Sequence, residues 1–189
     1  FTDLGIDVED LAPVTSLKTI HTHPPASKDY VQLVDRALAS EPENLHLQLL
    51  KFRALLARGE TQEAQEMAKG FIARPDAGFS VLSEATRFLD QLAGLAPNQK
   101  KQLMHGAVSK LAALDLPDAY VADEYYLSNR YQVPGISKVK EKLCEAGAGK
   151  VAVRERCDLA KQALERNVSF YQLLTKIDGY NLSLTILLR

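Results

Sequence analysis

The chain has 189 residues, of which 46% are hydrophobic and 25% charged, and its formal net charge is -1 at pH 7. This length is enough to bury one core, or a short repeat array, without help from a metal or a disulfide. The near-neutral charge argues against a nucleic-acid-binding protein of the usual basic kind. No apolar run is long enough to span a membrane. Strong helix formers outnumber β-branched residues, so we predict an all-α fold.

The first part of the chain lacks a sustained hydrophobic period. Pro13, Pro24 and Pro25 interrupt it, which predicts an irregular N-terminal arm over residues 1–27. Residues 28–189 are predicted to form a single α-helical repeat domain, closed by an apolar C-terminal capping segment. The sequence begins at Phe1 rather than at methionine, so we leave open that a leader or an upstream domain has been removed.

The clearest pattern lies between Asn44 and Pro75. Asn44 is placed to cap a helix, because its side-chain oxygen can accept from an amide of the first turn. Gly59 can supply the positive φ that ends this helix. A second helix is expected from Thr61 until Pro75 stops it. The inner face of the first helix is predicted at Leu45, Leu49, Phe52 and Leu56.

This stretch resembles one tetratricopeptide unit, which is about 34 residues long. Gly59, Ala64 and Leu55 stand where that family has its turn glycine, its small packing residue and a large apolar residue, and Pro75 closes the unit. The resemblance implies two antiparallel helices. Other family positions hold different residue types, so no peptide-groove residue is carried over.

Amphipathic periodicity predicts further helices over residues 29–40, 79–95, 97–114, 118–131, 137–145, 151–166 and 168–189. After Gly179, in the last of these ranges, the pattern fits a helix or a strand, and we favour a helix. Pro97 and Pro117 are placed in first turns, where the missing amide costs nothing. Helix pairs begin about every 35 to 40 residues, as in helical-hairpin repeats. We therefore predict about nine helices, paired as consecutive antiparallel hairpins in a short right-handed solenoid. A compact helical bundle is the alternative.

One short string, His21-Thr22-His23-Pro24, resembles the zinc-binding core of MPN-type metalloproteases. The resemblance implies that His21 and His23 bind zinc and leave a position open for water. The serine, aspartate and glutamate that complete that family's site have no counterpart at the required distances. We favour two surface histidines and assign no metal site.

Cys144 and Cys157 are the only cysteines, and they flank a glycine-rich break between two predicted helices. If the second helix starts near Val153, the two Cβ atoms can meet in a disulfide. Such a bond would stabilise the fold by about 3 kcal/mol and would indicate a periplasmic or otherwise exported protein. Two free thiols in a cytoplasmic protein are the alternative.

Aromatic and charged residues gather in one predicted helix. We predict that a binding surface, if the chain has one here, contains Tyr120, Glu124, Tyr125, Arg130 and Tyr131, because tyrosine buries area while keeping a hydroxyl for hydrogen bonding. The competing interpretation is that most of these are core aromatics of an amphipathic helix.

The leading hypothesis is a non-enzymatic helical-repeat scaffold that binds a protein partner through a concave helical surface and uses no cofactor. Two alternatives stay open. One is a zinc-dependent hydrolase that uses His21 and His23. The other is an accessory helical domain of a larger enzyme or envelope complex. The sequence names neither the partner nor the oligomeric state.

Overall fold

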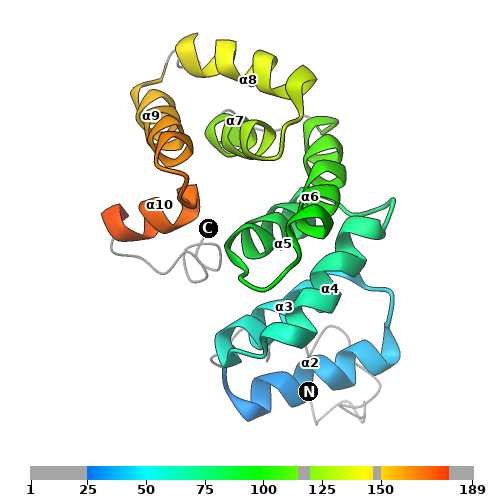
Figure 1. Ribbon diagram of the computed structural model, residues 1–189. Coiled ribbons are helices and arrows are strands. Elements are labelled where there is room, and N and C mark those ends of the chain that lie inside the picture. Colours follow the sequence, from blue (N-terminus) through cyan, green and yellow to red (C-terminus); the bar gives the residue numbers. More distant parts are fainter. Residues whose placement is uncertain (1–24, 115–119, 147–149, 179–189) are drawn as a thin grey trace. The chain divides into compact units, whose positions relative to one another are not determined.

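The computed structural model describes residues 25–114, 120–146 and 150–178, with no side-chain description for 175–178. This part of the chain folds into nine α-helices, so the all-α prediction is confirmed (Figure 1). Most consecutive helices in these ranges pack against each other. The helices are α2 (Lys28–Ser40), α3 (Leu45–Arg58), α4 (Thr61–Ala73), α5 (Phe79–Gln91), α6 (Pro97–Ala112), α7 (Val121–Arg130), α8 (Pro134–Ala146), α9 (Val151–Glu165) and α10 (Phe170–Asp178).

Contacts divide the chain into two compact units, with the boundary between Met67 and Ala68. Most of the predicted irregular arm and the predicted capping residues 179–189 lie outside the described residues. That residues 28–189 form one domain stays a prediction. No helix in the described ranges is long and apolar enough to cross a membrane.

Unit 1 is built on the packing of α2 against α3. The Asn44 side chain accepts from the amides of His46 and Leu47 at 3.0 and 3.2 Å, so its predicted role as a helix cap is confirmed. Gly59 has φ 72°, and it ends α3 as predicted. The core of this unit contains Tyr30, Val34, Ala37, Leu47, Leu50 and Ala54.

The turn at Gly59 brings the start of α4 back against α3. Lys51 in the middle of α3 pairs with Glu63 in the first turn of α4 at 3.4 Å. Ala64, the predicted small packing residue, is fully buried. A helix, a glycine turn and a second helix are therefore present. Membership of the tetratricopeptide family stays a prediction.

Unit 2 is organised around α7. The first eight residues of this helix, from Val121 to Ser128, are all buried. They are enclosed because α7 packs on α6, α8 and α9, and Figure 1 shows α7 between these neighbours. Helix α10 packs on α9 and also reaches α5. A stacked solenoid of hairpins stays a prediction.

Helix α8 begins three residues earlier than the range 137–145 that periodicity predicted. It starts at Pro134, whose missing amide would have no partner in the first turn anyway. The predicted first-turn role of Pro97 in α6 is confirmed. Pro117 lies outside the described residues.

Candidate functional site

The five residues of the predicted binding cluster lie on or beside α7, and the contacts that the structure gives them are mainly internal. Glu124, Tyr125 and Tyr131 are buried, whereas Tyr120 and Arg130 are half-buried. Their burial agrees with the interpretation as core residues of an amphipathic helix. That they also touch a ligand stays a prediction.

Tyr131 and Arg130 belong to a polar cluster around Asp90 of α5, whose side chain is 0% exposed. Asp90 Oδ1 accepts from the Tyr131 hydroxyl at 2.6 Å and lies 3.1 Å from Arg130 Nε. Asp90 Oδ2 accepts from the hydroxyls of Tyr126 at 3.0 Å and Ser169 at 2.9 Å. Each carboxylate oxygen thus has two donors, which is its full capacity. We call these five residues the Asp90 cluster.

The polar groups of the Asp90 cluster are paired with one another inside the protein. Burial raises the pKa of Tyr126 and of Tyr131, and the Asp90 carboxylate raises both further. Both hydroxyls therefore keep their protons at neutral pH and serve as donors. Nearby, Lys100 donates to the carbonyl oxygens of Asp90 and Leu92 at 2.6 and 3.1 Å, which satisfies acceptors at the end of α5.

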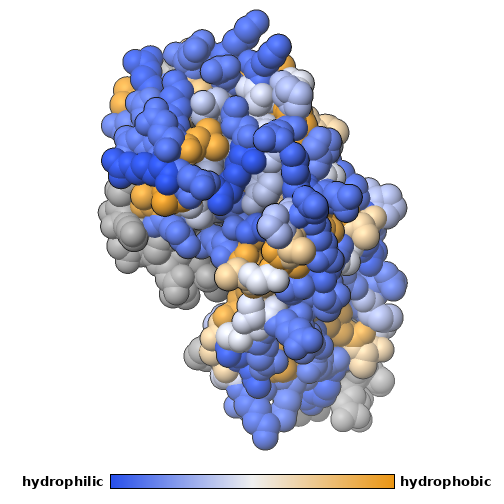
Figure 2. Space-filling view, in the orientation of Figure 1, coloured by the Kyte–Doolittle hydropathy of each residue, from blue (hydrophilic) through white to orange (hydrophobic). Residues whose placement is uncertain are grey.

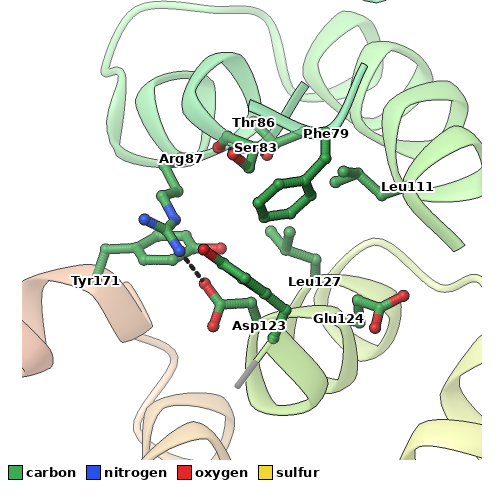
Figure 3. A pocket seen from close by; sticks show the side chains of 10 residues that line it. Phe79, Ser83, Thr86, Arg87, Leu111, Asp123, Glu124, Leu127 and Tyr171 are labelled. Carbon is green, nitrogen blue, oxygen red and sulfur yellow. Dashed lines mark hydrogen bonds and ion pairs between the residues drawn. The ribbon is translucent and has the colours of Figure 1, made fainter. Parts of the chain in front are cut away.

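A second charged group lies between α5, α7 and α10. Arg87 Nη2 pairs with Asp123 Oδ1 at 2.8 Å, and its guanidinium lies 5.5 Å from the centre of the Tyr171 ring. Figure 3 shows Arg87 reaching from α5 toward Asp123, with the Tyr171 ring beside it. Arg156 of α9 binds the other oxygen of Asp123 at 3.0 Å. Burial alone would lower the pKa of Arg87, but Asp123, Tyr171 and Tyr120 together outweigh it and the pKa is raised.

Arg87, Asp123 and Tyr171 line a cavity inside unit 2. Its volume is only about 10 Å³, roughly the space for one water molecule. A cavity of this volume holds no substrate-sized molecule, and the cation that could attract an acidic ligand is already paired with Asp123. It is lined by Phe79, Ser83, Thr86, Arg87, Leu111, Tyr120, Asp123, Glu124, Leu127 and Tyr171 (Figure 3).

The contact between α7 and α8 is held by a buried ion pair. Glu124 Oε2 lies 2.7 Å from Lys140 Nζ, and the Glu124 side chain is 4% exposed. Glu124 Oε1 is buried and has no hydrogen-bond partner among the described residues. Burial raises the pKa of Glu124, Lys140 lowers it, and the like charge of Asp123 raises it. The pair therefore positions α8 at an energetic cost.

A disulfide fixes the same face of α8 to α9. Cys144 and Cys157 are bonded with their Cα atoms 5.6 Å apart, so the predicted pairing is present. Both cysteines are buried. Cys144 follows Lys140 by four residues, which places the two side chains on one face of α8. The bond is consistent with an oxidising compartment.

The most apolar side of α8 lies next to the face that carries these bonds. Ile136, Val139 and Leu143 are spaced i, i+3 and i+7 and so form one ridge, which we call the α8 ridge. Ile136 is half-buried, whereas Val139 is 55% exposed and Leu143 39%. Among the described residues, only one other large hydrophobic side chain is exposed, that of Val151 at the start of α9. Figure 2 shows small hydrophobic areas within a mostly hydrophilic surface over α8 and α9.

A metal centre finds no support in the described ranges, where no three histidine, cysteine, aspartate or glutamate side chains are placed to share an ion. His21 and His23, the residues of the zinc hypothesis, lie outside the described residues. Their role stays a prediction.

Sequence reasoning missed two features of unit 2. Asp90 follows Leu82 and Thr86 at intervals of four, so the three side chains share the buried face of α5. A carboxylate on an otherwise buried face could have been recognised from this spacing. The outward α8 ridge has no comparable signal, because periodicity shows which residues share a face and not which face is covered.

Comparison with known proteins gives no relative: no family model, curated protein or solved structure matches the chain.

Proposed function

We propose that the chain is a helical scaffold that binds a protein partner, and that unit 2 presents the α8 ridge as the contact surface. The scaffold is of the stacked-hairpin type, resembles a tetratricopeptide array and works in an oxidising compartment such as a periplasm. The observation that carries this proposal is the orientation of α8. Its polar and cysteine face is turned inward, whereas Val139 and Leu143 are exposed.

The orientation is unfavourable for the isolated chain. Burying a valine or leucine side chain is worth about 1.5–3 kcal/mol, so an α8 rotated about its axis would gain stability by covering its ridge. Lys140 and Cys144 oppose that rotation through an ion pair and a disulfide. Specific bonds thus hold an apolar ridge at the surface. A partner that covers the ridge would bury these apolar side chains. A contact surface therefore explains why they are held exposed.

The test compares how much partner protein the wild type and a ridge variant retain. The full chain with Val139→Gln and Leu143→Gln keeps good helix formers but loses the apolar contact. We expect affinity purification from the cells that make the protein to recover a defined partner with the wild type, and at least about tenfold less with this variant.

The matched control changes two exposed side chains elsewhere in unit 2. Gln162→Glu on α9 and Gln172→Glu on α10 alter exposed positions without touching the ridge. This control should retain the partner in full. Equal recovery with the wild type and the ridge variant would refute the α8 ridge as the binding surface.

A further inference from the structure

We infer that the disulfide between Cys144 and Cys157 is a redox-sensitive switch for helix α8: its reduction by a dithiol releases α8 from α7 and α9, while the other helices of unit 2 stay folded. This inference does not depend on the proposed function, because it concerns what holds α8 in place and not what binds to it. It follows from how little else attaches α8 to the rest of the unit.

Helix α8 buries very little of its own side-chain surface. Nine of its 13 residues are exposed, three are half-buried, and the one that is buried is Cys144. The best-covered residue of the helix is therefore a partner in the disulfide itself. By contrast, the first eight residues of α7 are all buried. An isolated helix as short as α8 is marginal in water, so α8 needs an attachment to stay folded.

Two side-chain bonds join α8 to the rest of the described chain. One is the disulfide, and the other is the ion pair of Lys140 with Glu124. The ion pair is a weak attachment, because the Glu124 carboxylate is buried and its Oε1 has no hydrogen-bond partner among the described residues. Release of α8 would return both charges to water. The disulfide is therefore the stronger of the two attachments.

The neighbouring helices are joined by bonds that reduction leaves intact. Asp90 of α5 accepts from Tyr126 of α7 and from Ser169, the residue before α10. Asp123 of α7 pairs with Arg156 of α9 at 3.0 Å. Helices α5, α7, α9 and α10 thus stay connected without α8. The loss of α8 should leave this part of unit 2 folded.

The two ends of α8 are held differently. Just before its start, the buried Val133 donates from its amide to the Ser128 carbonyl at 2.7 Å, so the chain is bound to α7 there. Cys144 lies in the last turn of α8, so the disulfide holds the other end. Reduction should therefore free the C-terminal end of α8, with the turn at residues 131–134 as the hinge.

The reduction is a thiol–disulfide exchange. One thiolate of the dithiol attacks one cysteine sulfur, and the other cysteine leaves as a thiolate. The second thiolate of the dithiol then attacks the mixed disulfide. The protein gains two electrons and two protons and ends with two cysteine thiols, while the dithiol ends as a disulfide. Both cysteines are buried, so the first attack requires a transient opening of the end of α8.

Hydrogen–deuterium exchange of the full chain, measured by mass spectrometry with and without dithiothreitol, tests the inference. In the oxidised protein the amides of α8 should be protected. In the reduced protein they should exchange within about tenfold of the rate of an unfolded peptide, whereas the amides of α5 should stay at least about hundredfold slower than that rate. The intact mass after alkylation checks that the bond is broken.

The control is the double variant Cys144→Ala with Cys157→Ala. Its α8 should exchange as fast as that of the reduced wild type, and dithiothreitol should not change its exchange, because the responsive bond is absent. A response of this variant to dithiothreitol would show that the effect in the wild type does not come from the disulfide.

Three results would overturn the inference. If α8 stays protected in the reduced protein, the disulfide is not what holds it. If α8 exchanges freely in the oxidised protein, the disulfide does not hold it either. If all helices of unit 2 lose protection together on reduction, the bond supports the whole unit and not α8 alone. None of these results decides whether the α8 ridge binds a partner, which the recovery of partner by the oxidised ridge variant tests separately.

Discussion

Two of the buried carboxylates of unit 2, Asp90 and Glu124, are satisfied to different degrees. Asp90 receives donors on both oxygens, from two tyrosines, a serine and an arginine. Glu124 receives one lysine, and its other oxygen has no hydrogen-bond partner among the described residues. A fully satisfied buried carboxylate can bind helices together at little net cost, whereas a half-satisfied one is expensive. The comparison indicates that the Asp90 cluster secures the fold and that the Glu124–Lys140 pair sets the orientation of α8.

The largest expected effect is at Asp90. The substitution Asp90→Asn keeps the shape but removes the charge that faces Arg130, and it turns one acceptor into a donor that faces other donors. We expect the free energy of unfolding to fall by about 3–4 kcal/mol. Urea denaturation followed by circular dichroism measures this change. The exposed control Asp158→Asn should stay within about 0.5 kcal/mol of the wild type. A similarly small effect at Asp90 would show that the cluster does not hold the helices.

Removal of the disulfide should have the next largest effect. The double substitution Cys144→Ala with Cys157→Ala frees the chain between α8 and α9, and we expect a loss of about 3 kcal/mol. Denaturation of the oxidised and the dithiothreitol-reduced wild type should differ by a comparable amount. The intact mass before and after reduction checks that the bond is formed. Thiols that react with iodoacetamide in the native, unreduced protein would contradict the structure.

The Glu124–Lys140 pair should show strong coupling. Glu124→Leu alone leaves Lys140 partly buried without its partner and should cost about 2–3 kcal/mol. Adding Lys140→Met should restore stability to within about 1 kcal/mol of the wild type, since an apolar pair fits the same space. A double-mutant cycle measures this coupling. Additive losses would show that the two side chains act independently.

The same pair predicts a smaller dependence on pH. Burial raises the pKa of Glu124 in the folded state above its ordinary value of 4.5. The folded state therefore binds this proton more tightly than the unfolded state. The contribution of Glu124 to stability is complete below pH 4.5 and is lost as the pH rises through the raised pKa. Unfolding of the wild type and of the Glu124→Leu, Lys140→Met variant across this window should show a steeper decline in the wild type.

The smallest effect on stability is expected at the α8 ridge. Val139→Gln with Leu143→Gln should change the free energy of unfolding by about 1 kcal/mol or less, because both side chains are already exposed. The same substitutions should lower the recovery of the partner at least about tenfold. A loss of several kcal/mol would instead mean that the ridge is covered within the chain.

Helix positions were largely predictable from the sequence, because caps and breakers act locally. Asn44 and Gly59 mark the two ends of α3 through hydrogen bonds to their nearest neighbours in the chain. The burial of α7 was not predictable in the same way. Tyr126 and Tyr131 could serve equally as core or surface residues until Asp90, about forty positions earlier, is seen to accept from their hydroxyls.

The orientation of α8 was unpredictable for the same reason. Periodicity alone would place Ile136, Val139 and Leu143 against the core. Two long-range bonds outweigh that preference. They are the ion pair of Lys140 with Glu124 and the disulfide between Cys144 and Cys157. The sequence suggested the disulfide but not its consequence for the neighbouring face of the helix.

Photo-cross-linking from the ridge tests the central claim most directly. A benzoyl-phenylalanine placed at Val139 in the full chain, and irradiated in the cells that make the protein, should yield one discrete adduct with another protein. The same group at Gln162, which is exposed on α9, should yield none. If the cross-linker at Val139 gives no adduct, or gives the same mixture of products as the cross-linker at Gln162, the account is contradicted.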